Sequence, residues 1–173
     1  MPLSIASALM RFITLAAVLI GAGVTVPLAQ QLNGPVGSTL TAEAAKPVMA
    51  AAVAEAAKQK WPVVITIVDR SGQTILTERL PQARDFAVGL AEGKARTALT
   101  FRRPTQEIHD QLVSSGWLKR QWLTRWTFRG ATVLGGGLPI FAGDTLIGGI
   151  GVSGVSMEDD AKVALAGVAG MRR

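Results

Sequence analysis

The sequence contains no cysteine and no tyrosine, and His109 is its single histidine among 173 residues. The absence of cysteine excludes disulfide bonds and thiolate nucleophiles, so packing alone must stabilise the fold. No G-x-S-x-G nucleophile elbow accompanies His109, and no group of His, Asp and Glu has the spacing of metal ligands. Few residue types therefore remain for catalysis, and the sequence predicts a non-catalytic protein.

Acidic residues are absent from the first 29 positions, where Arg11 precedes the apolar segment Phe12–Ala29. A basic residue, an apolar stretch and a polar continuation at Gln30 are typical of a cleavable export signal. The same segment is just long enough for an uncleaved membrane anchor, but Thr14 and Pro27 interrupt it. We therefore predict export to the periplasm and cleavage near Gln30.

This prediction divides the chain into a signal peptide (1–29), a Gly/Pro-containing linker (30–39) and one domain (40–173). Only Arg11 of the 18 basic residues lies in the leader, so the mature net charge is +5. A positive charge favours acidic ligands and surfaces in general, without naming one. At 49% apolar residues, the chain is long enough to build one substantial core.

The first half of the domain predicts a helix, a hairpin and two further helices. Thr41 is the expected N-cap of a helix that ends near Lys60; Pro47 means that this helix either starts near Lys46 or bends. A hairpin is expected from Val63–Val68 and Gln73–Arg79. A second helix is expected over Asp85–Phe101 and a third from Pro104; the inner face of the second comprises Val88, Ala91, Ala95, Ala98 and Leu99.

The second half predicts a hairpin of Leu138–Phe141 and Thr145–Val152, followed by a helix capped by Ser156. The expected inner face of that helix comprises Met157, Ala161, Ala164, Leu165 and Val168. Glu158, Asp159 and Asp160 are interpreted as first-turn charges that complement the helix dipole.

Glycines at 148, 149 and 151 remove side chains from the second strand of this hairpin, so a backbone, a helix or a flat ligand can approach it closely. Gly149–Gly154 also matches G-x-G-x-x-G. Its strand belongs to a hairpin, however, and no acidic residue follows Asp160 to hold a ribose, so the pattern does not indicate a dinucleotide site.

Three segments together carry a family resemblance: Val63–Leu76 with D-x-x-G, Gly93–Thr105 ending in F-x-R-P-T, and Gly135–Gly154 with G-G-L-P-I and I-G-V-S-G. In this order they resemble the GlcG/HbpS-type haem-binding family over about residues 40–169. The resemblance implies a single α/β (α+β) domain with an antiparallel sheet of four or five strands, flanking helices and self-assembly.

The resemblance also implies a bound haem or related tetrapyrrole. His109 is the only imidazole available to iron, with Met49 and Met157 as weaker options, and a c-type attachment is excluded without cysteine. Arg102 and Arg103 could clamp propionates, with Lys94 and Arg96 adding charge. The alternatives are a helix residue bonded to a neighbour for His109 and a solvated basic cluster for the arginines.

The segment Trp117–Arg129 departs from the family pattern, holding three of the four tryptophans and four basic residues without an acid. Trp117, Trp122, Arg125 and Trp126 are residue types enriched at interface hot spots and form the predicted partner surface. A membrane surface or plain core and loop are alternatives, and export argues against nucleic acid.

Two functions follow. The first is a non-catalytic periplasmic binder of haem or a related tetrapyrrole. The second is a non-catalytic accessory subunit of a membrane-associated oxidoreductase complex, for example a quinone-linked alcohol dehydrogenase, in a homo- or hetero-oligomer.

Overall fold

The computed structural model describes residues 39–114 and 130–171, and the following account is confined to them. The elements, in chain order, are α3 (Ala42–Gln59), β1 (Val64–Asp69), β2 (Thr74–Arg79), α4 (Ala87–Phe101), α5 (Thr105–Ser114), β3 (Gly137–Ala142), β4 (Thr145–Ser153) and α7 (Met157–Gly170). The predicted signal peptide (1–29), most of the predicted linker and the predicted surface at Trp117, Trp122, Arg125 and Trp126 lie outside the described residues. No helix within the described ranges is long and apolar enough to cross a membrane.

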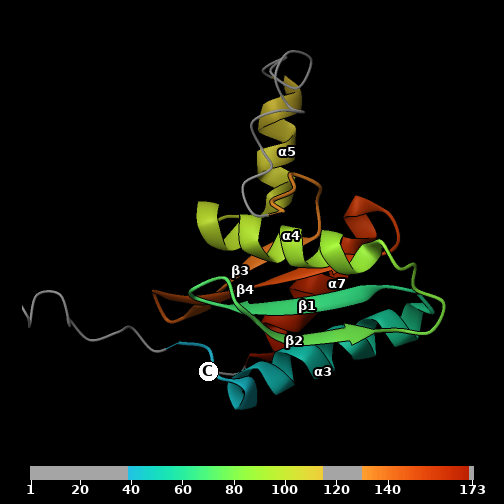
Figure 1. Cartoon of the computed structure of the whole chain (residues 1–173), viewed down its shortest axis with the longest axis horizontal. Coiled ribbons are helices and arrows are strands. Elements are labelled where there is room, and N and C mark those ends of the chain that lie inside the picture. The colour runs from blue at the N-terminus through green and yellow to red at the C-terminus, as the bar shows by residue number, and fades with distance from the viewer. Residues whose placement is uncertain (1–38, 115–129, 172–173) are drawn as a thin grey trace, which may run out of the picture. The chain divides into compact units, whose positions relative to one another are not determined.

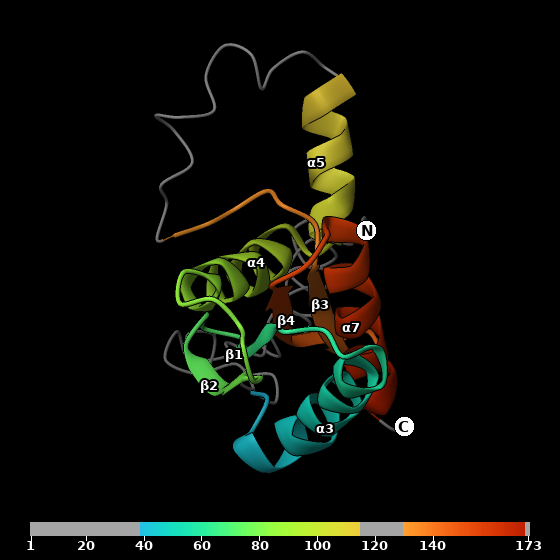
Figure 2. The ribbon, with the colours of Figure 1, turned by 90° about the vertical axis from the view of Figure 1, so that its right-hand side faces the viewer.

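The four strands form one antiparallel sheet in the order β2-β1-β4-β3. Helix α4 covers one face of this sheet, and α3 and α7 lie side by side on the other (Figures 1 and 2). Helix α5 projects away from these layers (Figure 1). The predicted α+β class with flanking helices and an antiparallel sheet of four or five strands is confirmed, and the sheet in the described residues has four.

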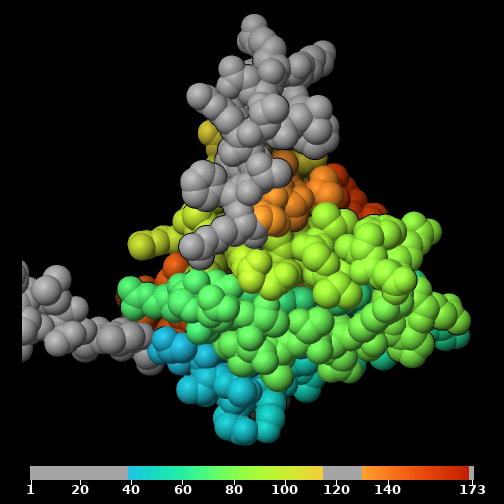
Figure 3. All heavy atoms as spheres, in the orientation of Figure 1, coloured from blue at the N-terminus to red at the C-terminus, as the bar shows by residue number. Residues whose placement is uncertain are grey.

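Strand β1 is buried on both faces, so its residues alternate between two apolar environments. Ile65 and Ile67 belong to the main core beneath α3 and α7, whereas Val64 and Val68 pack on the α4 side. Strand β2 lies at the edge of the sheet and is largely exposed. Together with α4 it contributes much of the face in view in Figure 3.

Helix α4 lies against the sheet at three positions that have no side chain. A Cβ on Gly151 would overlap the carbonyl oxygen of Ala91. A Cβ on Gly149 would lie 2.6 Å from the carbonyl oxygen of Ala95, and a Cβ on Gly137 would overlap the carbonyl oxygen of Lys94. The glycine-rich strand is therefore packed directly against a helix backbone, which is the structural option predicted for it. Gly148 points to the other face, toward Leu40.

Helix α3 begins at Ala42, with the Thr41 hydroxyl accepting a hydrogen bond from the Ala44 N–H at 3.2 Å. Thr41 is thus the N-cap as predicted, and Pro47 lies inside the helix rather than at its start. Two glycines of α7 face this helix. A Cβ on Gly170 would lie 2.8 Å from the Pro47 carbonyl oxygen, and a Cβ on Gly167 would lie 3.2 Å from the Val48 carbonyl oxygen. The two helices therefore pack at close range.

Two predicted inward positions are wrong. Val88 is 39% exposed and Leu165 is 63% exposed. In α4 the covered positions instead include Gly93 and Thr97, because the chain returning after residue 129 crosses this helix. The Thr97 hydroxyl accepts a hydrogen bond from the Thr132 N–H at 3.0 Å, so α4 is covered on its outer side as well.

The close approach of α4 predicts opposite effects for two glycine substitutions. Gly151→Ala should destabilise the domain by about 2–3 kcal/mol, because the new methyl group meets fixed backbone atoms of Ala91 and Ala95. Gly89→Ala, on α4 with nothing within 4 Å of its Cβ position, should instead stabilise it by about 0.5–1 kcal/mol. Urea denaturation of both variants measures these differences. A Gly151→Ala variant as stable as the parent would contradict the packing.

Candidate functional site

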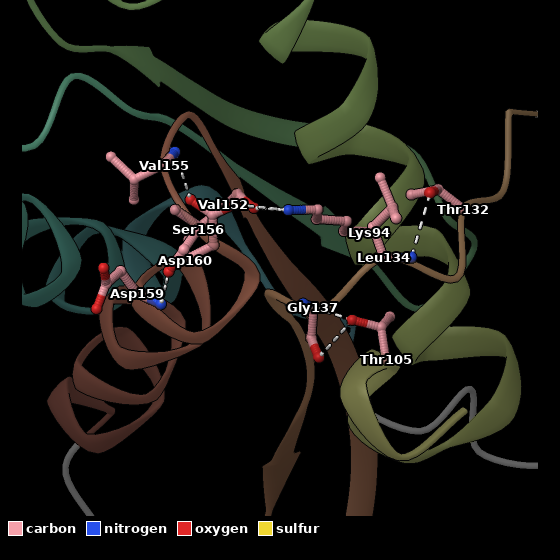
Figure 4. A network of polar contacts seen from close by, with 10 residues as sticks. All are labelled: Lys94, Thr105, Thr132, Leu134, Gly137, Val152, Val155, Ser156, Asp159 and Asp160. Carbon is pink, nitrogen blue, oxygen red and sulfur yellow. Dashed lines mark hydrogen bonds and ion pairs between the residues drawn. The ribbon is translucent and has the colours of Figure 1, made fainter. Parts of the chain in front are cut away.

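The side chain of Lys94 is enclosed beneath α4 at the end of β4, with 2% of its surface exposed. Its ammonium group donates to the Val152 carbonyl oxygen at 2.8 Å and to Asp160 Oδ2 at 2.7 Å (Figure 4). Lys94 was predicted to add charge at a ligand pole. The structure places it instead in an internal ion pair that joins α4 to α7.

Asp160 is the other half of this ion pair and is also buried. Its second oxygen accepts a hydrogen bond from the Val155 N–H at 3.2 Å. Asp160 does lie in the first turn of α7, as expected, but the interpretation as a helix-dipole charge is incomplete, because its carboxylate is paired with an internal lysine. Ser156 is the N-cap as predicted, and its hydroxyl accepts from the Asp159 N–H at 3.1 Å.

Burial raises the pKa of the Asp160 carboxyl and lowers the pKa of the Lys94 ammonium. In both cases the loss of hydration disfavours the charged form, and the attraction between the two groups opposes that effect. Each group therefore needs its partner to stabilise its charged form, since burial keeps both groups away from solvent.

Helix α5 is anchored to the sheet by its first residue. The hydroxyl of Thr105, which is fully buried, accepts a hydrogen bond from the Gly137 N–H at 2.9 Å (Figure 4). Ile108, one turn later, is the other buried residue of this helix within the described ranges. The base of α5 is thus held in the domain, while its later turns extend outward (Figure 1).

His109 lies on α5, and its residue surface is partly exposed. Its Nδ1 atom is enclosed without a hydrogen-bond partner. Within the described ranges, the only other buried side-chain nitrogen or oxygen without a partner is Gln106 Oε1, also on α5. Burial thus removes water from Nδ1 without supplying a hydrogen bond in its place.

Arg102 and Arg103 lie between α4 and α5. Arg102 ends α4 with a left-handed backbone (φ 56°) and is exposed. Arg103 is partly exposed and donates to Gln111 Oε1 at 2.6 Å. The two arginines and His109 thus lie in one short stretch of chain. Arg96 lies elsewhere on α4 and donates hydrogen bonds to the Gly72 carbonyl oxygen, between β1 and β2, and to the Glu92 carboxylate on α4.

The two methionines differ in accessibility. Met49 is 6% exposed within the main core, so the structure gives no support to the prediction of Met49 as a ligand. Met157 is partly exposed at the start of α7, and its Cβ lies near Gly135.

Sequence reasoning missed the role of Asp160. This residue looks like any acidic residue in a first turn, and only its pairing with Lys94, 66 positions away, distinguishes it. No local pattern marks Asp160, because its partner comes from another part of the fold.

Comparison with known families gives a match over most of the domain. A family model described as haem degrading protein HbpS-like covers residues 40–169. The chain is 35% identical over 127 residues to an uncharacterised 15.0 kDa protein from the dhaT-dhaS intergenic region of Citrobacter freundii, covering 73% of this chain and 88% of that protein. It is 33% identical over 117 residues to the protein GlcG of Escherichia coli, covering 66% and 81%.

The corrinoid adenosyltransferase PduO of Salmonella typhimurium is 35% identical over 120 residues, but this match spans only 35% of PduO. Among solved structures, a double mutant of HbpS from Streptomyces reticuli superposes with a TM-score of 0.67 and 35% identity, over 76% of this chain and 86% of that one. The complex of PduOC with haem gives a TM-score of 0.67 and 30% identity, over 77% and 95%.

The buried ion pair predicts a non-additive mutant cycle. Lys94→Met or Asp160→Asn alone should destabilise the domain by about 3–5 kcal/mol, because each leaves a buried charge without its partner. The double variant should lose less than the sum of the two, since no unpaired charge remains. Urea denaturation of the four proteins measures the coupling; additive losses would show that the two charges do not depend on one another. Lys162→Met, at an exposed ion pair with Asp159, serves as the control and should change stability by about 1 kcal/mol or less.

Proposed function

The chain belongs to the HbpS-like family of GlcG and HbpS relatives, and from this membership we propose that it binds haem or a related tetrapyrrole without catalysing its breakdown. The proposal is supported by the likeness to a structure that contains haem, the PduOC complex. It is also supported by the description of the family model, which names haem as the molecule acted on.

The observation that carries the proposal is the state of His109. The residue is partly exposed, and its Nδ1 is enclosed without a hydrogen-bond partner. A buried polar atom without a partner is rare, and it is often found where a ligand or water completes the site. An imidazole in this state fits an axial ligand of iron.

The charge of the surrounding chain fits the other end of a haem. Arg102 and Arg103 precede α5, and His109 follows about one turn after the start of this helix. Guanidinium groups bind carboxylates with two parallel hydrogen bonds, which is the contact that propionates offer. Haem, when bound, would supply an iron ion; His109 would offer a ligand atom to it, and Arg102 and Arg103 would hold the propionates.

We propose a binding role in place of catalysis, although the family model is named for haem degradation. PduO is an adenosyltransferase, but the match leaves about two thirds of that protein uncovered, so its activity is not carried over. The sequence offers no cysteine or tyrosine and one histidine, and the proposed role assigns that histidine to iron rather than to proton transfer.

We further propose that the protein is exported to the periplasm, on the basis of the basic and apolar pattern of residues 1–29. The alternative role as an accessory subunit of an oxidoreductase complex depends on the Trp117–Arg129 segment. That segment lies outside the described residues, so this role stays a prediction from sequence.

The binding proposal predicts a saturable Soret change when haemin is titrated into the purified protein. His109→Ala should shift the Soret band and weaken binding about tenfold or more, because it removes the only imidazole. Arg102→Ala combined with Arg103→Ala should weaken binding to a similar extent without moving the band, since these residues would contact the propionate edge.

The matched control for the arginines is Arg70→Ala with Arg84→Ala, which removes two exposed arginines outside the α4–α5 junction and should leave affinity unchanged. The non-catalytic role is checked in the same cuvette. With ascorbate and air, the Soret band should decay no faster than that of haemin bound to serum albumin. No saturable binding at micromolar haemin would reject the proposal, and rapid conversion to bile pigment would reject the non-catalytic part.

The export proposal predicts that the protein recovered from the periplasmic fraction starts near Gln30. Removal of the leader should leave a soluble chain with a net charge of +5. Intact-mass measurement of the fractionated protein tests this, and recovery of the full-length chain in the membrane fraction would contradict it.

A further inference from the structure

Helix α5 is attached to the rest of the domain through few residues. Thr105, its first residue, and Ile108 are the buried residues of this helix within the described ranges, and its later turns extend outward (Figure 1). A helix in a globular protein owes most of its stability to tertiary packing. The placement of α5, and of His109 on it, therefore depends on a small set of contacts at its base.

Both groups of the Thr105 side chain contact one residue of the sheet. The hydroxyl oxygen accepts a hydrogen bond from the Gly137 N–H at 2.9 Å (Figure 4). The methyl group lies against the same residue, because a Cβ on Gly137 would be 2.7 Å from Thr105 Cγ2. Gly137 is the first residue of β3 and is buried, so loss of the hydroxyl would leave its N–H without an acceptor. This contact fixes the start of α5 on the sheet.

The position of His109 follows from that of Thr105, four positions earlier on the same helix. Residues at i and i+4 lie on one face of a helix, and a rise of about 1.5 Å per residue separates them by about 6 Å along its axis. The rotation of α5 that places Thr105 on Gly137 therefore also determines the direction in which His109 leaves the helix. A change in that rotation would move the imidazole relative to the sheet.

Arg103 is joined to the same helix. It precedes α5 in the chain, and its guanidinium donates a hydrogen bond to Gln111 Oε1 at 2.6 Å. The far end of the arginine is thus attached to α5 rather than to the sheet. The proposed iron ligand and one of the proposed propionate contacts therefore depend on one attachment, the base of α5.

We propose that Thr105 is a positioning residue for the ligand site on α5: its hydrogen bond with the Gly137 N–H holds His109 in the place from which it reaches a bound tetrapyrrole. This inference rests on the proposed haem function. Thr105 is fully buried, so it acts through His109 and not by contact with the ligand. The hydrogen bond would then determine ligand affinity as well as stability, which a purely structural contact would not.

The test compares Thr105→Val, which keeps the branched shape and removes the hydroxyl, with Thr105→Ser, which keeps the hydroxyl. In haemin titrations, Thr105→Val should weaken affinity about tenfold and alter the Soret band of the complex, as loss of a group that orients a metal ligand commonly does. Thr105→Ser should restore affinity to within about twofold of the wild type, because the acceptor for the Gly137 N–H remains.

The matched control is Thr97→Val on α4. Thr97 is also a buried threonine whose hydroxyl accepts from a backbone N–H, that of Thr132, at 3.0 Å. Its replacement should lower the urea midpoint, as Thr105→Val does, but leave haemin affinity unchanged. An equal loss of affinity in Thr97→Val would show that lower stability alone weakens binding, and it would overturn the proposal.

The protein without haem gives an independent readout, because His109 is its single histidine. The ¹H and ¹³C resonances of the ring should shift in Thr105→Val and stay near their wild-type positions in Thr105→Ser and Thr97→Val. Unchanged resonances or unchanged haemin affinity in a folded Thr105→Val would overturn the positioning role. Failure of the wild type to bind haemin would reject the proposed function, and the ring resonances would still decide whether Thr105 positions His109.

If Thr105→Val does not fold, as judged by circular dichroism, Thr105→Ala replaces it, since alanine favours a helix. Failure of both variants to fold beside a folded Thr105→Ser would make the hydroxyl a requirement of the fold itself and overturn the positioning role.

Discussion

The rest of the structure depends on the direct contact between the backbone of α4 and the sheet. Gly137, Gly149 and Gly151 present no side chains on that face, so carbonyl oxygens of α4 approach the strands more closely than any Cβ would allow. Such an approach places residues of the helix within the interior that would otherwise reach solvent. Lys94 is the main example, since its side chain is 2% exposed although it belongs to a helix on the surface of the sheet.

The buried lysine in turn requires a carboxylate, and Asp160 supplies it from α7. Helices α4 and α7 cover opposite faces of the sheet, and the side chains of Lys94 and Asp160 meet near the end of β4, beside Val152 and Val155 (Figure 4). A charge pair at this point joins the two outer layers. Because both groups are buried, any shift of one layer that separated them would leave a charge unpaired in the interior.

Much of this fold was predictable from sequence because its signals are local. The Thr41 and Ser156 caps and the closeness of a helix to the glycine-rich strand all follow from residues a few positions apart. The inward positions of Val88 and Leu165 were wrong because periodicity cannot tell which other segments cover a helix. Lys94 was misassigned for a related reason: its partner is distant in sequence, and a lysine near two arginines resembles a basic surface.

The candidate site differs from the rest of the domain in how it is held. Helix α5 is fixed at Thr105 and Ile108, whereas His109, Gln106 and Arg103 are only partly buried. Residues that make few contacts with the core can change without unfolding it, so sequence variation here can alter ligand binding while the glycine contact and the ion pair maintain the fold. His109 and Gln106 therefore resemble parts of a site more than parts of a core, because an enclosed polar atom without a hydrogen-bond partner lowers the stability of the fold.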